Sequence, residues 1–103
     1  MKKINLKELN DLISSGDKIF IKFGAEWCGQ CKMSGLLIDK LEPLYTDIKF
    51  FEIDVDDNNL WDDKKLNITE VPTFLGFDNK KLKFNSPGYK IEDELVKLIN
   101  QLK

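Results

Sequence analysis

Two cysteines stand three positions apart in this chain, and the chain has no others. They lie in the segment Trp27-Cys28-Gly29-Gln30-Cys31-Lys32. The segment follows a predicted strand and opens a helical pattern, so both cysteines are expected in the first turn of a helix, close enough to bridge. The unpaired amides and partial positive charge of a helix N-terminus favour thiolate at Cys28. Since the thiolate is the nucleophile in disulfide exchange, this spacing predicts a redox-active pair.

A cysteine pair can also serve as a structural disulfide or as part of a metal site. A disulfide that closes a four-residue loop stabilises a fold by only about 2 kcal/mol in the chain-entropy model, so a purely structural bridge is disfavoured. A metal site needs four ligands, and the chain has no histidine and no third cysteine to add to Cys28 and Cys31. A metal is therefore not expected within one chain, but a Cys₄ metal or iron–sulfur site shared by two chains stays open as an alternative.

Composition narrows the function classes further. The 103 residues are 42% hydrophobic and 33% charged, which is typical of one globular domain spanning residues 1–103. All sixteen basic residues are lysines, against eighteen acidic ones, so a nucleic-acid partner is not expected. The absence of histidine excludes Ser-His-Asp and Cys-His catalysis.

Targeting signals were sought at the start of the chain and along it. Basic residues occur in the segment Met1–Glu8, but no apolar segment of the kind found in signal peptides follows them. No apolar stretch approaches the length of a membrane span. We therefore expect a cytoplasmic chain with no membrane partner.

Hydrophobic periodicity predicts four helices. The first follows a cap at Asn5 and ends at Gly16, and a short one covers residues 60–66. The last carries apolar residues at helical spacing from Ile91 to Leu102. A helix that begins near Cys28 is expected to end or kink at Pro43. Its expected buried residues are Met33, Leu37, Leu41 and Leu44.

The predicted strands are short apolar runs. Residues 18–23 form such a run, interrupted by Lys22, and residues 48–55 form another, interrupted at its centre by Glu52. Residues 73–77 and 81–84 form a hairpin around the turn at residues 78–80. Strands that alternate with helices, followed by a hairpin and a helix, predict an α/β sandwich with a mixed sheet.

Three segments together resemble one family. Phe23-Gly24-Ala25-Glu26-Trp27-Cys28-Gly29-Gln30-Cys31-Lys32-Met33 closely resembles the active-site segment of thioredoxins. Val71-Pro72-Thr73 resembles the family's second motif, in which the proline peptide bond is cis and faces the cysteines. Gly88, after the hairpin, fits the third loop of the family's substrate groove. The resemblance extends over nearly the whole chain and implies the thioredoxin fold, a central mixed β-sheet flanked by helices on both faces.

The resemblance also implies a mechanism. Cys28 would attack a substrate disulfide, and the more buried Cys31 would resolve the mixed disulfide, which is two-step thiol–disulfide exchange. The chain would be a monomeric protein-disulfide reductase with no cofactor beyond its own disulfide. An NADPH- or ferredoxin-linked reductase would recycle it. Substrate contacts would come from Trp27, Gly29, Gln30, Val71, Pro72 and Gly88.

Two departures from the family pattern concern prolines. Gln30 stands where thioredoxins usually have proline, and in the family such a replacement makes the disulfide more oxidising. A disulfide oxidase or isomerase therefore stays open as an alternative. Leu36 stands where a helix-kinking proline is common, so the helix after Cys28 is expected to run straighter.

A third departure concerns charge. Lys22 stands where the family has a buried aspartate, and Glu52 stands where a lysine is expected. Each is a charge within a mainly apolar run, and the resemblance places these strands side by side. We therefore predict a partly buried, charge-reversed ion pair beneath the cysteines, since an unpaired charge there would be costly. Either residue could handle the proton of Cys31, and the alternative is that Lys22 extends to solvent.

The segment from Glu52 to Asp63 contains six acidic residues and no basic one. Asp54 begins a partial match to a calcium-binding EF-hand loop, but that loop needs glycine where Asn59 stands and glutamate where Lys65 stands. The segment is therefore interpreted as a solvated acidic loop. Trp61 is expected to pack beneath it.

Overall fold

The computed structural model describes residues 1–103. Its strands are β1 (Lys2–Ile4), β2 (Ile19–Gly24), β3 (Lys49–Asp54), β4 (Thr73–Asp78) and β5 (Lys81–Pro87). Its α-helices are α1 (Leu6–Ser15), α2 (Gly29–Leu41) and α3 (Glu92–Asn100), and two short 3₁₀ segments are η1 (Glu42–Leu44) and η2 (Leu60–Asp62). None of these helices has the length and apolar content that crossing a membrane requires.

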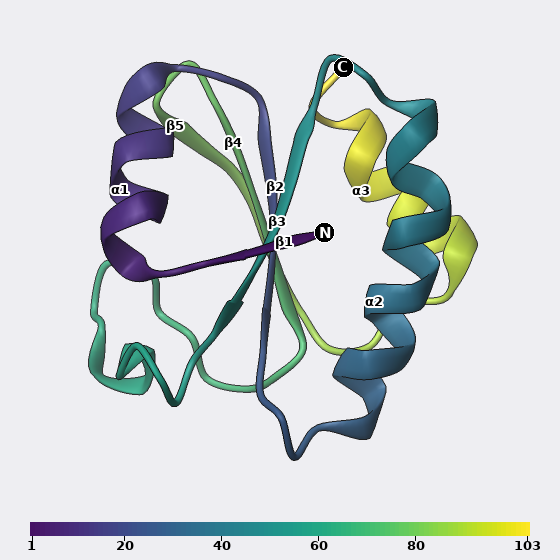
Figure 1. The fold of residues 1–103 in the computed structure, drawn as a ribbon. Coiled ribbons are helices and arrows are strands. Elements are labelled where there is room, and N and C mark those ends of the chain that lie inside the picture. Colours follow the sequence, from purple (N-terminus) through teal and green to yellow (C-terminus); the bar gives the residue numbers. More distant parts are fainter.

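The five strands form one mixed sheet in the order β1-β3-β2-β4-β5. β3 pairs in parallel with both β1 and β2, whereas β4 runs antiparallel to β2 and β5 antiparallel to β4. Helix α1 covers one face of the sheet, and α2 and α3 cover the other (Figure 1). The predicted α/β architecture, with a mixed sheet and helices on both faces, is confirmed.

The sheet separates two apolar cores. Side chains alternate between the faces of a strand, so Ile21 and Phe23 of β2 join the core that also contains Leu9 of α1. Phe20 joins the core of the opposite face, together with Ile38 of α2. The same alternation places Lys22, two residues after Phe20, on the side of the sheet that α2 covers.

The predicted first helix is confirmed, with local reasons for both ends. The Asn5 side chain accepts a hydrogen bond from the backbone N–H of Glu8, and the Glu8 carboxylate accepts one from the backbone N–H of Asn5. This reciprocal pair satisfies two amides of the first turn. The helix ends at Gly16, whose φ of 84° is readily adopted by glycine.

The buried face predicted for the second helix is right for Leu41, which is buried, and for Leu37, which is half-buried against the same core, but wrong for the other two residues. Met33 is 55% exposed and Leu44 is 73% exposed. The face that packs on the sheet instead begins at Cys31 and includes two small residues, which is why hydrophobic spacing does not reveal it. Its residues are Cys31, Ser34, Gly35, Ile38 and Leu41. The helix ends at Leu41, just before Pro43, as expected.

Two further elements differ from prediction. Strand β1 was not expected, because two of its three residues are lysines, yet it pairs with β3. The helix expected over residues 60–66 is only the short η2. Beyond it, the Asp63 carboxylate accepts hydrogen bonds from the backbone N–H groups of Lys65 and Leu66. A side chain that bonds the backbone in this way favours a turn over a helix.

The predicted hairpin and last helix are present. Strands β4 and β5 pair around a turn in which Asn79 and Lys80 have positive φ. Helix α3 buries Leu95, Leu98 and Ile99. Ile91, expected on the buried face, is instead the residue that precedes the helix and is 56% exposed.

Candidate active site

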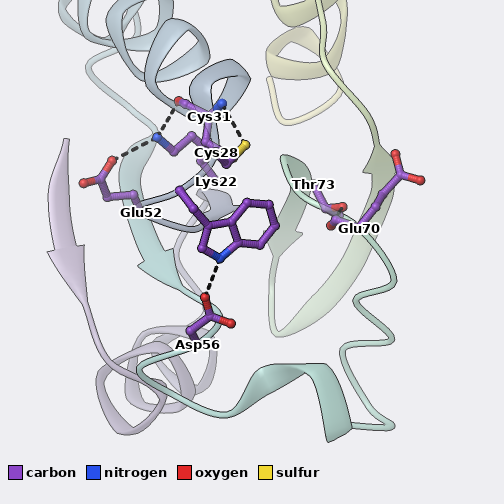
Figure 2. Close-up of a disulfide and its surroundings, with 8 residues drawn as sticks. Lys22, Cys28, Cys31, Glu52, Asp56, Glu70 and Thr73 are labelled. Carbon is purple, nitrogen blue, oxygen red and sulfur yellow. Dashed lines mark hydrogen bonds and ion pairs between the residues drawn. A yellow bond between two sulfur atoms is a disulfide. The ribbon is translucent and has the colours of Figure 1, made fainter.

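The two cysteines lie where β2 passes into α2, and they are joined by a disulfide (Figure 2). Cys28 is the N-terminal cap of α2, and its sulfur accepts a hydrogen bond from the backbone N–H of Cys31 at 3.1 Å. Cys28 is 7% exposed and Cys31 2% exposed. Once the disulfide is reduced, this amide and the helix N-terminus stabilise a thiolate at Cys28.

The turn before the cysteines brings their backbone close to β2. The backbone N–H of Cys28 donates to the carbonyl oxygen of Ala25 at 3.1 Å, which closes the turn. A Cβ atom on Gly24 would lie 3.3 Å from the sulfur of Cys31. Glycine at this position therefore lets the end of the strand approach the second cysteine closely.

The loop that contains Val71-Pro72 and the loop that contains Gly88 are joined by a hydrogen bond. The Val71–Pro72 peptide bond is cis, and the Pro72 carbonyl oxygen accepts from the backbone N–H of Gly88 at 2.8 Å. Gly88 has a φ of 95°, and Val71 packs against the core that contains both cysteines. The Thr73 hydroxyl donates to the carbonyl oxygen of Glu70 at 2.7 Å and holds the start of β4 (Figure 2).

Three expected substrate-contact residues surround Cys28 on the surface. The Trp27 side chain is 68% exposed, and Gly29 and Gln30 are exposed as well. A Cβ atom on Gly29 would meet nothing within 4 Å, so the space next to the cysteine is open. The first turn of α2 therefore presents backbone rather than bulky side chains at this point.

One carboxylate joins two indoles beside the site. Asp56 accepts a hydrogen bond from Trp27 Nε1 at 2.7 Å through one oxygen and from Trp61 Nε1 at 2.8 Å through the other. Trp61 is 38% exposed, so the expectation that it packs beneath the acidic loop is wrong. The role of Asp56 was missed, because nothing in the sequence links it to a tryptophan 29 positions earlier.

These hydrogen bonds predict a measurable titration. Donation from Trp61 and from Trp27 holds the pKa of Asp56 below its ordinary value of 3.8. The interaction therefore stabilises the fold above that value and is lost as the pH falls through the lowered pKa. We expect tryptophan fluorescence to titrate with a midpoint below 3.8. The transition should disappear in Asp56→Asn, and a midpoint at or above the ordinary value would contradict the prediction.

The predicted ion pair is present beneath the cysteines. Lys22 Nζ lies 3.2 Å from Glu52 Oε2 and donates a hydrogen bond to the backbone carbonyl of Cys31 at 2.9 Å. The two residues are directly opposite in the β2–β3 register. The Lys22 side chain is 8% exposed and that of Glu52 28%, so Lys22 does not extend into solvent as the alternative supposed.

Metal ligands are not gathered anywhere in the chain. No group of three or more Cys, Asp or Glu side chains is arranged to hold an ion. Within the acidic loop, Asp54 instead accepts hydrogen bonds from the backbone N–H groups of Asp56 and Asp57. Its carboxylate shapes a turn, in agreement with the interpretation of this segment as an acidic loop.

Known proteins resemble the chain in sequence and in structure. The thioredoxin family model matches residues 1–101. A putative thioredoxin-4 from Dictyostelium discoideum is 33% identical over 108 residues, covering 100% of each chain. Thioredoxin from Mycoplasma pneumoniae is 31% identical over 97 residues, covering 94% of each. The oxidised form of mitochondrial thioredoxin 3 from Saccharomyces cerevisiae superposes with a TM-score of 0.85 at 34% identity, covering 97% of this chain and 93% of that one.

These similarities bear on the alternatives left open above. The family match covers nearly all of the chain, and the relatives favour neither a disulfide oxidase or isomerase nor a metal-binding module. Cys28 and Cys31 form a disulfide at a helix N-terminus, which fits a redox-active pair of this family. The chain thus belongs to the thioredoxin family and is a thioredoxin-type dithiol–disulfide oxidoreductase.

Proposed function

We propose that the chain reduces protein disulfides, with Cys28 as the attacking residue and Cys31 as the resolving one. The position of the Cys28 sulfur carries this proposal, since it caps α2 and accepts an amide hydrogen bond that also favours its thiolate. Cys31 follows one turn later and is the less exposed of the two. A buried thiol next to the first sulfur is suited to an intramolecular second step.

The proposed exchange transfers two electrons to the substrate. The Cys28 thiolate forms a bond to one sulfur of the substrate disulfide, and the other substrate sulfur leaves as a thiolate that takes up a proton. The Cys31 thiolate then attacks the Cys28 sulfur, and the first substrate sulfur leaves in the same way. The substrate ends as a dithiol, and the chain ends with the Cys28–Cys31 disulfide.

The surface around Cys28 is the proposed substrate groove. Trp27, with its exposed indole, would contact the polypeptide on one side of the disulfide. The backbone of Val71 would pair with the substrate as an added strand, and Pro72 and Gly88 would shape that side of the groove. Gly29 would leave room for the substrate sulfur to approach, and the exposed Gln30 would contact the substrate beside it.

The partners and the setting of the reaction are also proposed. A reductase that draws electrons from NADPH or ferredoxin would return the disulfide to the dithiol. The chain would act as a monomer in the cytoplasm, without a metal or organic cofactor and without nucleic-acid or membrane partners. Thioredoxin-family proteins work with such reductases and with disulfide substrates, which supports this part of the proposal.

Insulin reduction tests the proposed direction of the reaction. With dithiothreitol as electron donor, the purified chain should accelerate the precipitation of insulin chains well beyond dithiothreitol alone. The variant with both Cys28 and Cys31 replaced by serine is the matched control and should show no acceleration. If the chain instead speeds disulfide formation in a reduced protein and leaves insulin intact, it is an oxidase and the proposal is wrong.

A further inference from the structure

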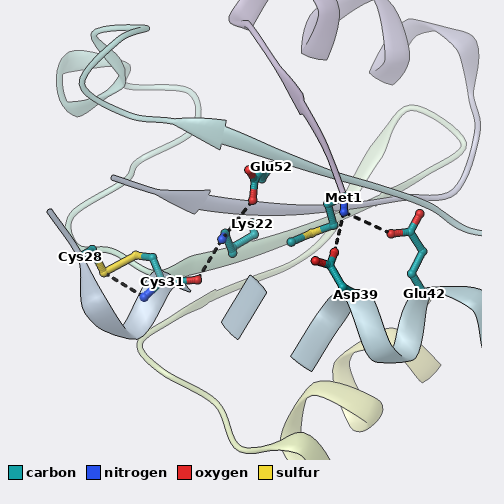
Figure 3. A network of polar contacts seen from close by, with 7 residues as sticks. All are labelled: Met1, Lys22, Cys28, Cys31, Asp39, Glu42 and Glu52. Atoms are coloured by element: carbon teal, nitrogen blue, oxygen red, sulfur yellow. Dashed lines mark hydrogen bonds and ion pairs between the residues drawn. A yellow bond between two sulfur atoms is a disulfide. The ribbon is translucent and has the colours of Figure 1, made fainter. Parts of the chain in front are cut away.

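One buried lysine lies against the cysteine pair but has no role in the bond changes described above. Lys22 is 6% exposed and is the only buried lysine of the chain. Its ammonium reaches from β2 to the first turn of α2, where it lies between the Cys31 carbonyl and the Glu52 carboxylate (Figure 3). Burying a charged amine is costly, so its position against a redox-active cysteine requires an explanation.

The helix leaves room for this ammonium. A Cβ atom on Gly35 would lie 3.0 Å from Lys22 Nζ, closer than the amine tolerates without moving. Glycine is a poor residue inside a helix, so its presence in α2 runs against local preference. Gly35 thus lets the charged end of Lys22 stay against the turn that carries Cys31.

We propose that the Lys22 ammonium stabilises the Cys31 thiolate and so accelerates the second step of exchange. The inference rests on the roles proposed for the two cysteines. Cys31 is 2% exposed, and burial opposes the ionisation of a thiol. A positive charge held against the same residue favours ionisation. Lys22 is accordingly a positioning residue that acts through its field.

In the second step of exchange, Cys31 must lose its proton before its sulfur can attack. The Cys31 thiol loses its proton, its sulfur bonds to the Cys28 sulfur, and the bond from Cys28 to the substrate breaks. The substrate sulfur leaves with the electron pair and takes up a proton from solvent. A cavity of about 390 Å³ lined by Lys22, Cys31 and Glu52 is large enough for water, which can accept the proton from Cys31.

The other charged residues that line this cavity do not bond to Cys31 through their side chains. The remaining charged residues that line it come from β1, α2, β3 and the loop before α2, and they are Lys3, Glu26, Lys32, Asp39 and Asp54. The amine of Met1 faces the same side and pairs with Asp39 of α2 and Glu42 of η1 (Figure 3). Lys22 is the lysine among these residues whose amine bonds to Cys31.

Glu52 makes the proposal testable because its charge has the opposite sign. Its carboxylate holds the Lys22 ammonium in place, but it also offsets the field that the ammonium exerts on Cys31. Loss of either partner would disturb a purely structural ion pair in a similar way. An electrostatic role instead requires that neutralising Lys22 and neutralising Glu52 shift the ionisation of Cys31 in opposite directions.

The two steps can be followed separately with 5,5′-dithiobis(2-nitrobenzoate). Attack by Cys28 of the reduced chain releases one coloured thionitrobenzoate, and resolution by Cys31 releases the second. We expect Lys22→Met to move the midpoint of the second rate against pH upward by about one unit, so that release below the midpoint is roughly tenfold slower. We expect Glu52→Gln to move this midpoint downward.

The control for charge alone is Lys32→Met, since Lys32 lines the same cavity but is exposed. Its midpoint should stay within a few tenths of a unit. An unmoved midpoint in Lys22→Met, or shifts of the same sign in both variants, would overturn the inference. Slower release in Glu52→Gln at every pH would also overturn it and would make Glu52 the proton acceptor.

Two other results of this experiment also decide the question. If Lys22→Met does not fold, Glu52→Gln decides alone, because it keeps the lysine and an isosteric side chain. A downward shift then supports the inference, and an unmoved or upward midpoint rejects it. If Cys31 attacks first in the unaltered chain and Cys28 releases the second thionitrobenzoate, the proposed cysteine roles are wrong. That result is distinct from an unshifted midpoint, which rejects only the role of Lys22.

Discussion

Replacing Cys28 by serine is expected to abolish disulfide reduction, whereas replacing Cys31 by serine should trap substrates on the protein. A serine hydroxyl at the helix N-terminus does not ionise near neutral pH, so the first bond to the substrate cannot form. In Cys31→Ser the first step still occurs, but no second thiolate releases the substrate from Cys28. The measurement is non-reducing electrophoresis or intact mass after incubation with a disulfide protein.

The two variants are each other's matched controls, because the same sulfur-to-oxygen change is made in both. Covalent adducts should form only in Cys31→Ser and should be released by dithiothreitol. Insulin turnover should be undetectable in Cys28→Ser under conditions where the unaltered chain is active. Adducts that form on Cys28→Ser and not on Cys31→Ser would reverse the roles of the two residues.

The local features of the site were predictable because they depend on neighbours in the sequence. The position of Cys28 and Cys31 at the start of a helix followed from their spacing and from the strand before them. The ion pair between Lys22 and Glu52 was predictable for a related reason. Each lies within a mainly apolar run, the family resemblance places these two strands side by side, and their parallel register sets the two residues opposite one another.

Other features depend on packing that no local pattern records. The buried face of α2 includes Ser34 and Gly35, neither of which gives a hydrophobic signal. A side chain at Gly35 would crowd the amine of Lys22, which comes from a different element. The Asp56 carboxylate reaches Trp27 only because the loop after β3 lies beside the turn before α2. These contacts become visible only when the tertiary structure is known.

The largest loss of stability is expected at Phe20, in the core between the sheet and helices α2 and α3. Its ring is fully buried and lies 5.4 Å from the ring of Phe50, 5.8 Å from that of Phe74 and 5.9 Å from that of Phe84. Phe20→Ala should lower the free energy of unfolding by about 3–5 kcal/mol. Domains of this kind have about 5–15 kcal/mol in total.

Urea unfolding followed by circular dichroism measures this loss, with Phe20→Leu as the control that keeps most of the volume. The leucine variant should lose distinctly less, because the remaining cavity is smaller. Equal losses in both variants, or a loss below about 1 kcal/mol in Phe20→Ala, would mean that the neighbouring rings close the cavity. The cysteines are not among the residues of the core around Phe20. Disulfide exchange per folded molecule should therefore stay close to that of the unaltered chain, so that stability and chemistry are separable in this protein.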